Sequence, residues 1–390
     1  MNKIVSDTNK KHNEHMTAEI RKNYKLNNKE KLSGKTILKS MPVRISVNLT
    51  GRCNNKCSYC NLSIPGVEYY TKEEMSFDTF SLLTPFLPTL SYLVYFANAE
   101  PLIAKNFKEI YKASSNYSME KYLSTNGIAL TKKMSELLVS GGLNYMQISI
   151  SGTNKESYRK YHQINCFSII ISHIKELNYI KDKYKTNEPR LRLTFTVMKD
   201  NIHELCDAVR LAADLNFSEG VQLRHLIGYK EELYDQIVPE SDSPSNTKYV
   251  NHIEKAKALA KELHIPLTGD YVNTDIDHKG DHISVTSEEA LHMDHLPCYE
   301  PFERLHVETD GKVRPCPSYS SNIFAGDLKK QTIWDVWNGE VMQHYRKNVN
   351  TINEPEGCKT CLSGHYRKRT RDDIWQQKDM DMLIYKRNNV

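Results

Sequence analysis

Strand-like and helical segments alternate between residues 43 and 227. Runs rich in β-branched and aromatic residues, a composition typical of strands, cover 43–50, 91–96, 121–124, 145–150, 191–198 and 220–227. Segments with helical periodicity separate these runs at 78–87, 105–115, 131–138, 167–183 and 202–216. This alternation predicts βαβ units and a parallel sheet. We therefore expect an α/β fold, a partial (β/α)6 TIM-like barrel, with its active site at the carboxyl ends of the strands.

The segments that flank this predicted barrel (43–227) have a different character. Residues 1–42 are polar and rich in Lys, Asn and Glu, and we interpret them as a partly helical N-terminal leader. Residues 228–297 are also polar, which indicates a connector or a lid, with an amphipathic helix near 248–264. Short elements and cysteines between 298 and 390 predict a small, cysteine-rich α+β extension.

Three cysteines follow the first predicted strand with the spacing Cys53-x3-Cys57-x2-Cys60. Thiolates are soft ligands that suit iron–sulfur clusters and zinc. Structural zinc and simple electron-transfer clusters usually take four protein ligands, so three thiolates leave one coordination position open. On a cubane cluster, an open iron can chelate the amine and the carboxylate of an amino acid. A zinc ion completed by a remote ligand is the alternative interpretation.

The cysteine motif, with the aromatic Tyr59 before its last cysteine, resembles that of the radical S-adenosylmethionine (SAM) superfamily. The resemblance implies a [4Fe–4S] cluster on Cys53, Cys57 and Cys60 whose open iron binds SAM. It also implies one-electron cleavage of SAM to a 5′-deoxyadenosyl radical, which abstracts hydrogen from a substrate while the protein orients and shields the reactants. An electron donor such as flavodoxin or ferredoxin is then required.

Short segments after the next predicted strands are similar to the SAM-binding segments of the same superfamily. Asn98-Ala99-Glu100-Pro101 resembles its G-G-E-P segment with both glycines replaced, and implies that Glu100 accepts hydrogen bonds from the SAM ammonium group. A helix N-cap or a surface acid is the alternative role for Glu100.

Two further matches follow in order. Thr125-Asn126-Gly127 resembles a turn near the SAM site, although Asn-Gly is also a generic turn. Ser149-Ile150-Ser151-Gly152 is similar to S-x-D-G, with a serine in place of the aspartate. The resemblance thus implies four cofactor-binding residues: Tyr59, Glu100, Asn126 and Ser149.

A second group of cysteines, in the predicted extension, comprises Cys298, Cys316, Cys358 and Cys361. Asp310-Gly311 predicts a hairpin between the first two, and a helix should contain Trp334 and Trp337. This arrangement resembles the SPASM/twitch extension of radical SAM enzymes. The resemblance implies one auxiliary [4Fe–4S] cluster on the four cysteines, of the shorter twitch type because a full SPASM domain carries more cysteines. Structural zinc is the alternative.

Three further residues are candidate catalytic groups. Cys166 is free to return a hydrogen atom, as in some radical SAM epimerases, although a structural role is the alternative. Arg224 and His225 are neighbours on the last predicted barrel strand, so one of them should face the barrel interior. That residue would bind substrate or act as an acid or base.

Composition restricts the partners and the compartment. The net charge of +5 is spread along the chain without a dense basic block, so nucleic acid is not an expected partner. The sequence contains no run of the roughly 20 apolar residues needed to span a bilayer and begins with a polar segment. We therefore expect a cytoplasmic protein with no membrane partner, in which clustered cysteines serve metals or catalysis rather than disulfides.

Our leading functional hypothesis is oxidative or cross-linking modification of a ribosomal peptide or a protein side chain. It depends on the SPASM/twitch resemblance, because that group is rich in peptide maturases, and not on a substrate site. Dehydrogenation or epimerisation of an aminocyclitol or sugar is the alternative, with a small molecule as substrate. A non-catalytic metal-binding module is a third interpretation, which the substituted Asn98, Ala99 and Ser151 positions allow.

Overall fold

The computed structural model describes residues 16–60, 62, 73–96, 99–227, 231–238, 247–269, 298–316, 323–351, 353–355 and 358. Its strands are β1 (Arg44–Asn48), β2 (Tyr92–Phe96), β3 (Glu120–Thr125), β4 (Tyr145–Ser149), β5 (Arg190–Val197), β6 (Val221–His225), β7 (Leu267–Gly269), β8 (Arg304–Val307), β9 (Lys312–Arg314) and β10 (Gly326–Asp327). They form one sheet in the order β10-β9-β8-β1-β2-β3-β4-β5-β6-β7.

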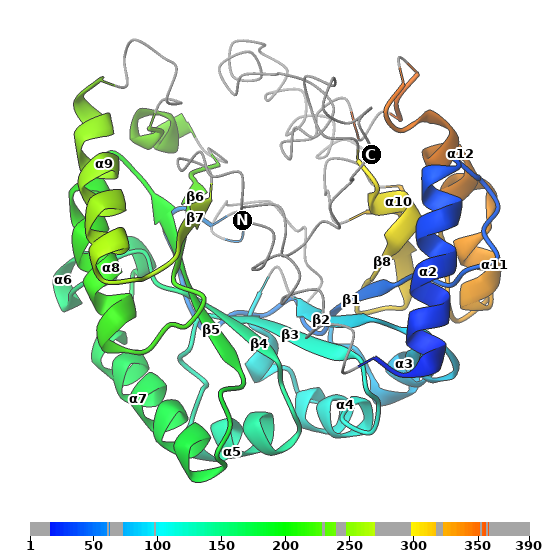
Figure 1. Cartoon of the computed structure of the whole chain (residues 1–390), viewed down its shortest axis with the longest axis horizontal. Helices are drawn as coiled ribbons and strands as arrows, with labels where there is room; N and C mark the ends of the chain where they lie inside the picture. The colour runs from blue at the N-terminus through cyan, green and yellow to red at the C-terminus, as the bar shows by residue number, and fades with distance from the viewer. Residues whose placement is uncertain are drawn as a thin grey trace.

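The described helices are α2 (Ala18–Leu32), α3 (Phe77–Ser81), α4 (Phe107–Ser114), α5 (Lys132–Ser140), α6 (Lys155–His162), α7 (Phe167–Lys183), α8 (Leu205–Asp214), α9 (Thr247–Glu262), α10 (Glu300–Glu303), α11 (Ile333–Trp337) and α12 (Glu340–Asn348). Short 3₁₀ segments are η2 (Thr84–Thr89), η3 (Pro101–Ile103), η4 (Ile202–Glu204) and η5 (Glu231–Gln236). Figure 1 shows the sheet as an open arc, with α4, α5, α7 and α8 along its outer side.

The predicted partial barrel is confirmed. β1 to β6 fall on the six predicted strand runs, and every neighbouring pair among them is parallel. Two further strands extend the parallel sheet. β7, which we did not predict, pairs with β6, and β8, the first strand of the predicted hairpin, pairs with β1, a pairing that we did not predict. The described sheet does not close, since its order ends at β7 on one side and at β10 on the other.

Alternating residues of the strands separate the core from the concave side of the sheet. In β5, Leu191, Leu193, Phe195 and Val197 are completely buried on the side that the helices cover. Burying a side chain of this size stabilises the fold by roughly 1.5–3 kcal/mol. The intervening residues of β5 are largely polar, so the concave side can carry chemistry without disturbing the core.

One helical prediction needs correction, and one helix was missed. The segment predicted as one helix over 78–87 is divided into α3 and η2, because Pro85 and Pro88 lack the amide hydrogen that a continuous helix requires. Helix α6 was not predicted at all. The predicted helix over 167–183 is α7, with the same ends.

The N-terminal segment packs against the C-terminal extension. Asn27 in α2 donates to the carbonyl oxygen of Phe302 at 2.7 Å, and Lys31 forms an ion pair with Glu303. The Trp337 indole donates to the carbonyl oxygen of Ser40 at 2.8 Å. The described part of the predicted leader is therefore an integral part of the fold on this side.

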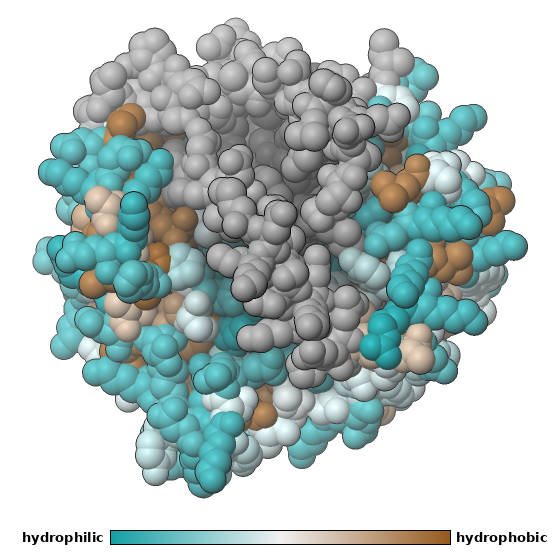
Figure 2. Space-filling view, in the orientation of Figure 1, coloured by the Kyte–Doolittle hydropathy of each residue, from teal (hydrophilic) through white to brown (hydrophobic). Residues whose placement is uncertain are grey.

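The surface of the described residues is mainly hydrophilic in the view of Figure 2, with small separate hydrophobic areas. Leu32, Ile37 and Trp334 are among the exposed large hydrophobic side chains. Within the described part of the chain, no helix is long and apolar enough to cross a membrane.

Candidate metal centre

The three cysteines of the first motif lie in the loop of residues 51–60, which follows the carboxyl end of β1 and which we call the cysteine loop. Cys53, Cys57 and Cys60 are partly buried. The loop turns on itself, because the Asn55 amide donates to Cys53 Sγ at 3.4 Å and the Cys60 amide donates to the Cys57 carbonyl oxygen at 3.1 Å. The loop therefore places the thiols at the edge of the sheet where we expected the active site.

The thiols of the cysteine loop influence one another electrostatically. The pKa of Cys53 is raised to about 11 and that of Cys57 to about 12, mainly by burial, and the neighbouring Cys60 thiol contributes to both rises. Such thiols keep their protons at neutral pH, but a coordinated metal replaces the proton outright. Three thiols that mutually disfavour negative charge are stabilised when a cationic cluster binds, so the residues fit an iron–sulfur cluster.

The zinc alternative fits this loop less well. Within the described ranges, no three His, Cys, Asp or Glu side chains converge closely enough to hold a single metal ion. A cubane cluster places each thiolate on a separate iron and therefore needs ligands that are farther apart than those of one zinc ion. The described part of the chain therefore shows no ready-made site for a single zinc ion.

Glu100 joins two of the predicted cofactor-binding segments. Its carboxylate, on a residue only 1% exposed, accepts hydrogen bonds from Thr125 Oγ1 at 2.7 Å and from the Asn126 amide at 2.7 Å. It also accepts from the Leu102 amide at 3.1 Å, as the N-cap of η3. Burial raises the pKa of Glu100 to about 7, and the three hydrogen bonds oppose this rise. Glu100 can therefore serve both as the N-cap of η3 and as a residue of the candidate SAM-binding site.

Asn126 connects this arrangement to the cysteine loop. Its side-chain nitrogen donates to Asn54 Oδ1 at 2.8 Å and lies 3.7 Å from Cys53 Sγ. The turn that it begins has Gly127 at a φ of +78°, a conformation that favours glycine. The structure thus brings the predicted residues Glu100 and Asn126 together beside Cys53, while Asn98 lies outside the described residues.

Ser151, which replaces the aspartate of the S-x-D-G pattern, is almost fully buried. Its hydroxyl oxygen accepts from Tyr59 Oη at 2.9 Å and from the Thr196 amide at 3.1 Å. Tyr59 therefore ties the cysteine loop to the segment after β4. Ser149, a predicted cofactor contact, is the last residue of β4 and is partly exposed at the same edge of the sheet.

The sequence interpretation missed His162, the last residue of α6. Its Nδ1 lies 3.2 Å from Cys57 Sγ, and its Nε2 accepts from the Ser151 amide at 3.1 Å. Burial lowers the pKa of His162 to about 3, so the imidazole ring is neutral at neutral pH. The Asn154-x-x-Ser157 capping box at the start of α6 was the sequence signal that could have revealed this helix.

The strand register distinguishes the two candidate residues of β6. Arg224 pairs with Thr196 and His225 pairs with Val197. Directly paired residues point to the same face of a sheet, so His225 lies on the helix-covered face with the fully buried Val197. Arg224 is exposed and lies on the opposite, concave face. Of the two residues, Arg224 is therefore the one on the concave face, and its contact with a substrate stays a prediction.

Cys166 is the N-cap residue of α7 and packs, partly buried, against the hydrophobic core. This packing is compatible with the structural role weighed above. A hydrogen-donating role for Cys166 stays a prediction.

The second cysteine group is described except for Cys361, which lies outside the described residues. β8 and β9 form the predicted hairpin between Cys298 and Cys316, with Gly311 at a φ of +91°. The amide of Cys298 donates to Asn350 Oδ1 at 2.7 Å, and Asn350 Nδ2 donates back to the Cys298 carbonyl oxygen at 2.9 Å. This pair of bonds brings the segment that leads to Cys358 alongside Cys298.

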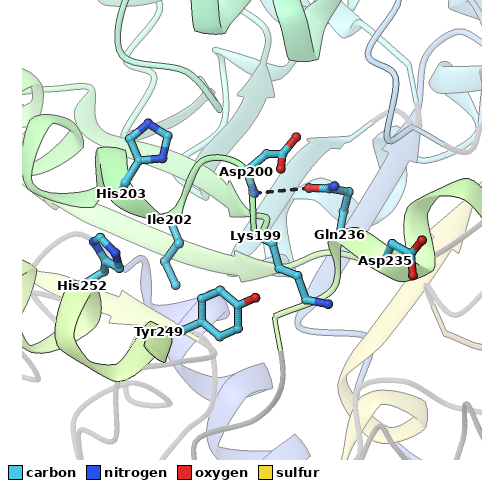
Figure 3. Close-up of a pocket in the computed structure, with 8 residues that line it drawn as sticks. All are labelled: Lys199, Asp200, Ile202, His203, Asp235, Gln236, Tyr249 and His252. Carbon is cyan, nitrogen blue, oxygen red and sulfur yellow. Dashed lines mark hydrogen bonds between the residues drawn. The ribbon is translucent and has the colours of Figure 1, made fainter. Parts of the chain in front are cut away.

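A separate hollow of about 620 Å³ opens beyond the end of β5 (Figure 3). Its lining includes Lys199, His203, Tyr249 and His252, and the Asp200 amide donates to Gln236 Oε1 at 3.2 Å in its wall. None of the predicted site residues lines this hollow. It is therefore distinct from the candidate metal centre.

Two family models match the chain. The radical SAM superfamily model matches residues 47–212, and the SPASM model, an iron–sulfur cluster-binding domain, matches residues 298–362. The AdoMet-dependent heme synthase of Methanosarcina barkeri is 25% identical over 327 residues, which cover 78% of this chain and 85% of that protein. The PqqA peptide cyclase of Bradyrhizobium diazoefficiens is 23% identical over 334 residues, which cover 82% of this chain and 79% of that protein.

Solved structures share the fold. Streptococcus suis SuiB bound to its precursor peptide SuiA superposes with a TM-score of 0.60 at 11% sequence identity. The match covers 81% of this chain and 69% of that chain. The likeness supports the partial barrel with an open sheet.

Proposed function

The chain belongs to the radical SAM superfamily and carries a SPASM iron–sulfur domain, and from this premise we propose that it modifies a ribosomally made peptide by oxidation or cross-linking. The superfamily makes it an enzyme that uses SAM and a [4Fe–4S] cluster, and the SPASM domain adds auxiliary iron–sulfur chemistry. When bound, these cofactors supply a 5′-deoxyadenosyl radical that abstracts hydrogen from the substrate.

In this proposal, the residues around the cysteine loop bind the cluster and orient SAM. Cys53, Cys57 and Cys60 hold the SAM-binding cluster, and Tyr59 fixes the cysteine loop to Ser151. Glu100 and Asn126 shape the neighbouring turn, where the ammonium group of SAM is expected. Protein groups held in place by buried hydrogen bonds orient a cofactor without reorganising during the reaction.

The second group of cysteines would hold the electron acceptor that the proposed reaction requires. Cys298, Cys316, Cys358 and Cys361 would hold the auxiliary cluster. Forming a cross-link would remove two hydrogen atoms from the peptide, one of which the chemistry supplied by SAM would take up. The other leaves as a proton and an electron, and the auxiliary cluster would accept that electron. Among the described polar groups on the concave face, Arg224 is placed to bind an acidic or carbonyl group of the peptide.

The peptide assignment is supported by two similar proteins that act on or bind peptides. A peptide cyclase matches 82% of this chain, and a structure with a precursor peptide bound matches 81% of it. Both matches are long enough to include residues on each side of the connector, so they are not limited to the radical-generating barrel. The heme synthase is similarly distant in sequence, so this assignment must be tested directly.

Incubation of the anaerobically reconstituted, reduced protein with SAM and, in separate reactions, with short ribosomal peptides or with aminocyclitols and sugars tests the proposal. We expect 5′-deoxyadenosine to form and the peptide mass to fall by two hydrogen atoms for each new bond. Formation of 5′-deoxyadenosine with turnover of an aminocyclitol or sugar, and none of the peptide, would contradict the peptide assignment. A complete absence of 5′-deoxyadenosine would instead favour the non-catalytic alternative.

A further inference from the structure

The carboxyl end of α6 contacts the cysteine loop through two consecutive residues, Tyr161 and His162. The Ser58 amide donates to the carbonyl oxygen of Tyr161 at 2.9 Å, and the Ser58 hydroxyl donates to the same atom at 3.2 Å. The next residue, His162, is 1% exposed and brings its ring to Cys57. His162 belongs to none of the predicted SAM-binding segments, yet its ring is in contact with Cys57, a proposed cluster ligand.

The hydrogen-bond partners of His162 define its tautomer. The Ser151 backbone nitrogen lies 3.1 Å from Nε2 and can only donate, so Nε2 carries no proton. A neutral imidazole with an accepting Nε2 has its proton on Nδ1. Nδ1 is therefore a hydrogen-bond donor.

Two atoms lie near this donor, and only one of them can accept. Cys57 Sγ and Asn55 Nδ2 are each 3.2 Å from Nδ1. Asn55 Oδ1 already accepts from the Lys56 amide at 2.8 Å, which orients Nδ2 toward the ring, and an amide nitrogen donates rather than accepts. The Nδ1–H group is thus left to Cys57 Sγ.

Neighbouring side chains hold the ring in this orientation. Tyr158, one helical turn earlier, stacks on His162 with ring centroids 4.1 Å apart and an interplanar angle of 12°. Tyr59 meets the same ring edge-on, at a centroid distance of 5.8 Å. A ring flip would move the proton away from Cys57 and would break the bond from Ser151, so the packing preserves one donor direction.

We propose that His162 is a positioning residue that donates a hydrogen bond from Nδ1 to Cys57 Sγ and thereby raises the reduction potential of the cluster on the cysteine loop. A hydrogen bond to a ligating sulfur stabilises negative charge, and the reduced cluster carries one more negative charge than the oxidised one. The inference rests on the cluster ligation proposed above and does not depend on the identity of the substrate.

Two variants of His162 separate the bond to Cys57 from the bond to Ser151. In His162→Gln, the side-chain oxygen reaches the position of Nε2 and can accept from Ser151, but the donor beside Cys57 is lost. In His162→Asn, the side-chain nitrogen occupies the position of Nδ1 and can donate to Cys57, while the contact with Ser151 is lost. The two variants thus form a matched pair, each keeping one of the two bonds.

The measurement is the midpoint potential of the SAM-binding cluster in the full reconstituted protein, followed by EPR during a redox titration. The cluster is identified as the one whose signal changes when SAM is added. We expect His162→Gln to shift the midpoint to a more negative potential, and His162→Asn to lie closer to the unmodified protein. An unchanged potential in His162→Gln at full iron content, or equal shifts in both variants, would overturn the proposal.

The metal-free protein provides a second readout if His162→Gln fails to take up its cluster. In ¹⁵N-histidine NMR, the signal that disappears in the His162 variants should show a protonated Nδ1 and an unprotonated Nε2. The opposite tautomer would overturn the proposal. A Cys57→Ala variant that keeps the full SAM-sensitive EPR signal would instead show that the ligation is wrong, which is a separate failure.

Discussion

At the residue scale, the cysteine loop depends on buried polar contacts. Asn126 reaches the loop from the end of β3, His162 reaches it from α6, and Tyr59 reaches out of it to Ser151. A buried polar group that loses its partner is destabilising because water cannot replace that partner. Single substitutions at these positions should therefore alter the site strongly even where they leave the sheet intact.

Replacing Glu100 by Gln should lower both stability and SAM cleavage. The carboxylate accepts three buried hydrogen bonds, and the amide nitrogen of glutamine would face at least one of those donors without accepting from it. We expect a loss of about 1–3 kcal/mol in the free energy of unfolding, measured by urea denaturation. Glu109→Gln, at an exposed position of α4, is the control and should change stability far less. Equal losses in both variants would show that the Glu100 contacts are unimportant.

His306 in β8 should make the stability depend on pH. Burial lowers its pKa to about 4, whereas an unfolded histidine has a pKa of about 6.5. Between these values the unfolded chain binds the proton and the folded chain does not, so stability falls as the pH falls through this window and is complete above it. At pH 5 the loss is about 2 kcal/mol relative to neutral pH. Urea unfolding should show a smaller loss for His306→Gln; an identical loss would contradict this assignment.

At the scale of the elements, α6 is short but determines how the cysteine loop is held. Its first turn is fixed by the Asn154 cap and by Glu204, whose carboxylate accepts from Thr153 and Ser157. A Cβ atom on Gly152 would lie 2.5 Å from the Tyr158 backbone nitrogen, so glycine is required for α6 to approach the end of β4. The geometry of the metal centre therefore depends on a helix that contributes no cysteine.

Loss of the α6 cap should disturb the metal centre more than the loss of an equivalent cap elsewhere. Asn154→Ala and Thr131→Ala each remove an N-cap side chain, from α6 and α5 respectively, at about 1 kcal/mol of stability. Asn154→Ala should also reduce the iron content or alter the SAM-sensitive EPR signal, because α6 ends in Tyr161 and His162. Thr131→Ala should leave both unchanged. Indistinguishable iron content and EPR spectra in the two variants would contradict the role of α6.

At the scale of the whole molecule, the barrel and the extension share one continuous sheet. β8 pairs with β1 in parallel, and the described N-terminal segment packs against the extension through Asn27, Lys31 and Ser40. Because strands of the barrel and of the extension pair in one sheet, unfolding of one region removes hydrogen-bond partners from the other. We therefore expect the described regions to unfold together.

Trp337 gives a test of this cooperativity. Its buried indole donates to the Ser40 carbonyl oxygen, and Trp337→Phe leaves that oxygen without this donor, which we expect to reduce stability by about 1–3 kcal/mol. Trp334→Phe, at a residue 40% exposed in the same helix, is the matched control and should have little effect. Circular dichroism and hydrogen exchange should report one shifted transition for Trp337→Phe. Separate transitions for the barrel and the extension would contradict a single cooperative unit.

The sequence by itself determined the features that depend on local pattern. Strand runs such as 191–198 show the β-rich composition of a strand covered by helices, and β5 lies within one residue of that prediction. The three cysteines of the loop are close in sequence, so their spacing alone indicated a shared cluster. The family matches agree with that interpretation.

Only the tertiary structure decided which distant residues surround those cysteines. Cys57 and His162 are 105 positions apart, and α6 carries too few apolar residues for its periodicity to stand out. The choice of Arg224 over His225 likewise needed the register with β5. Residue spacing specifies which side chains share a loop or a face, whereas contacts between segments depend on how whole strands and helices pack, because that packing is set by the burial of the entire core.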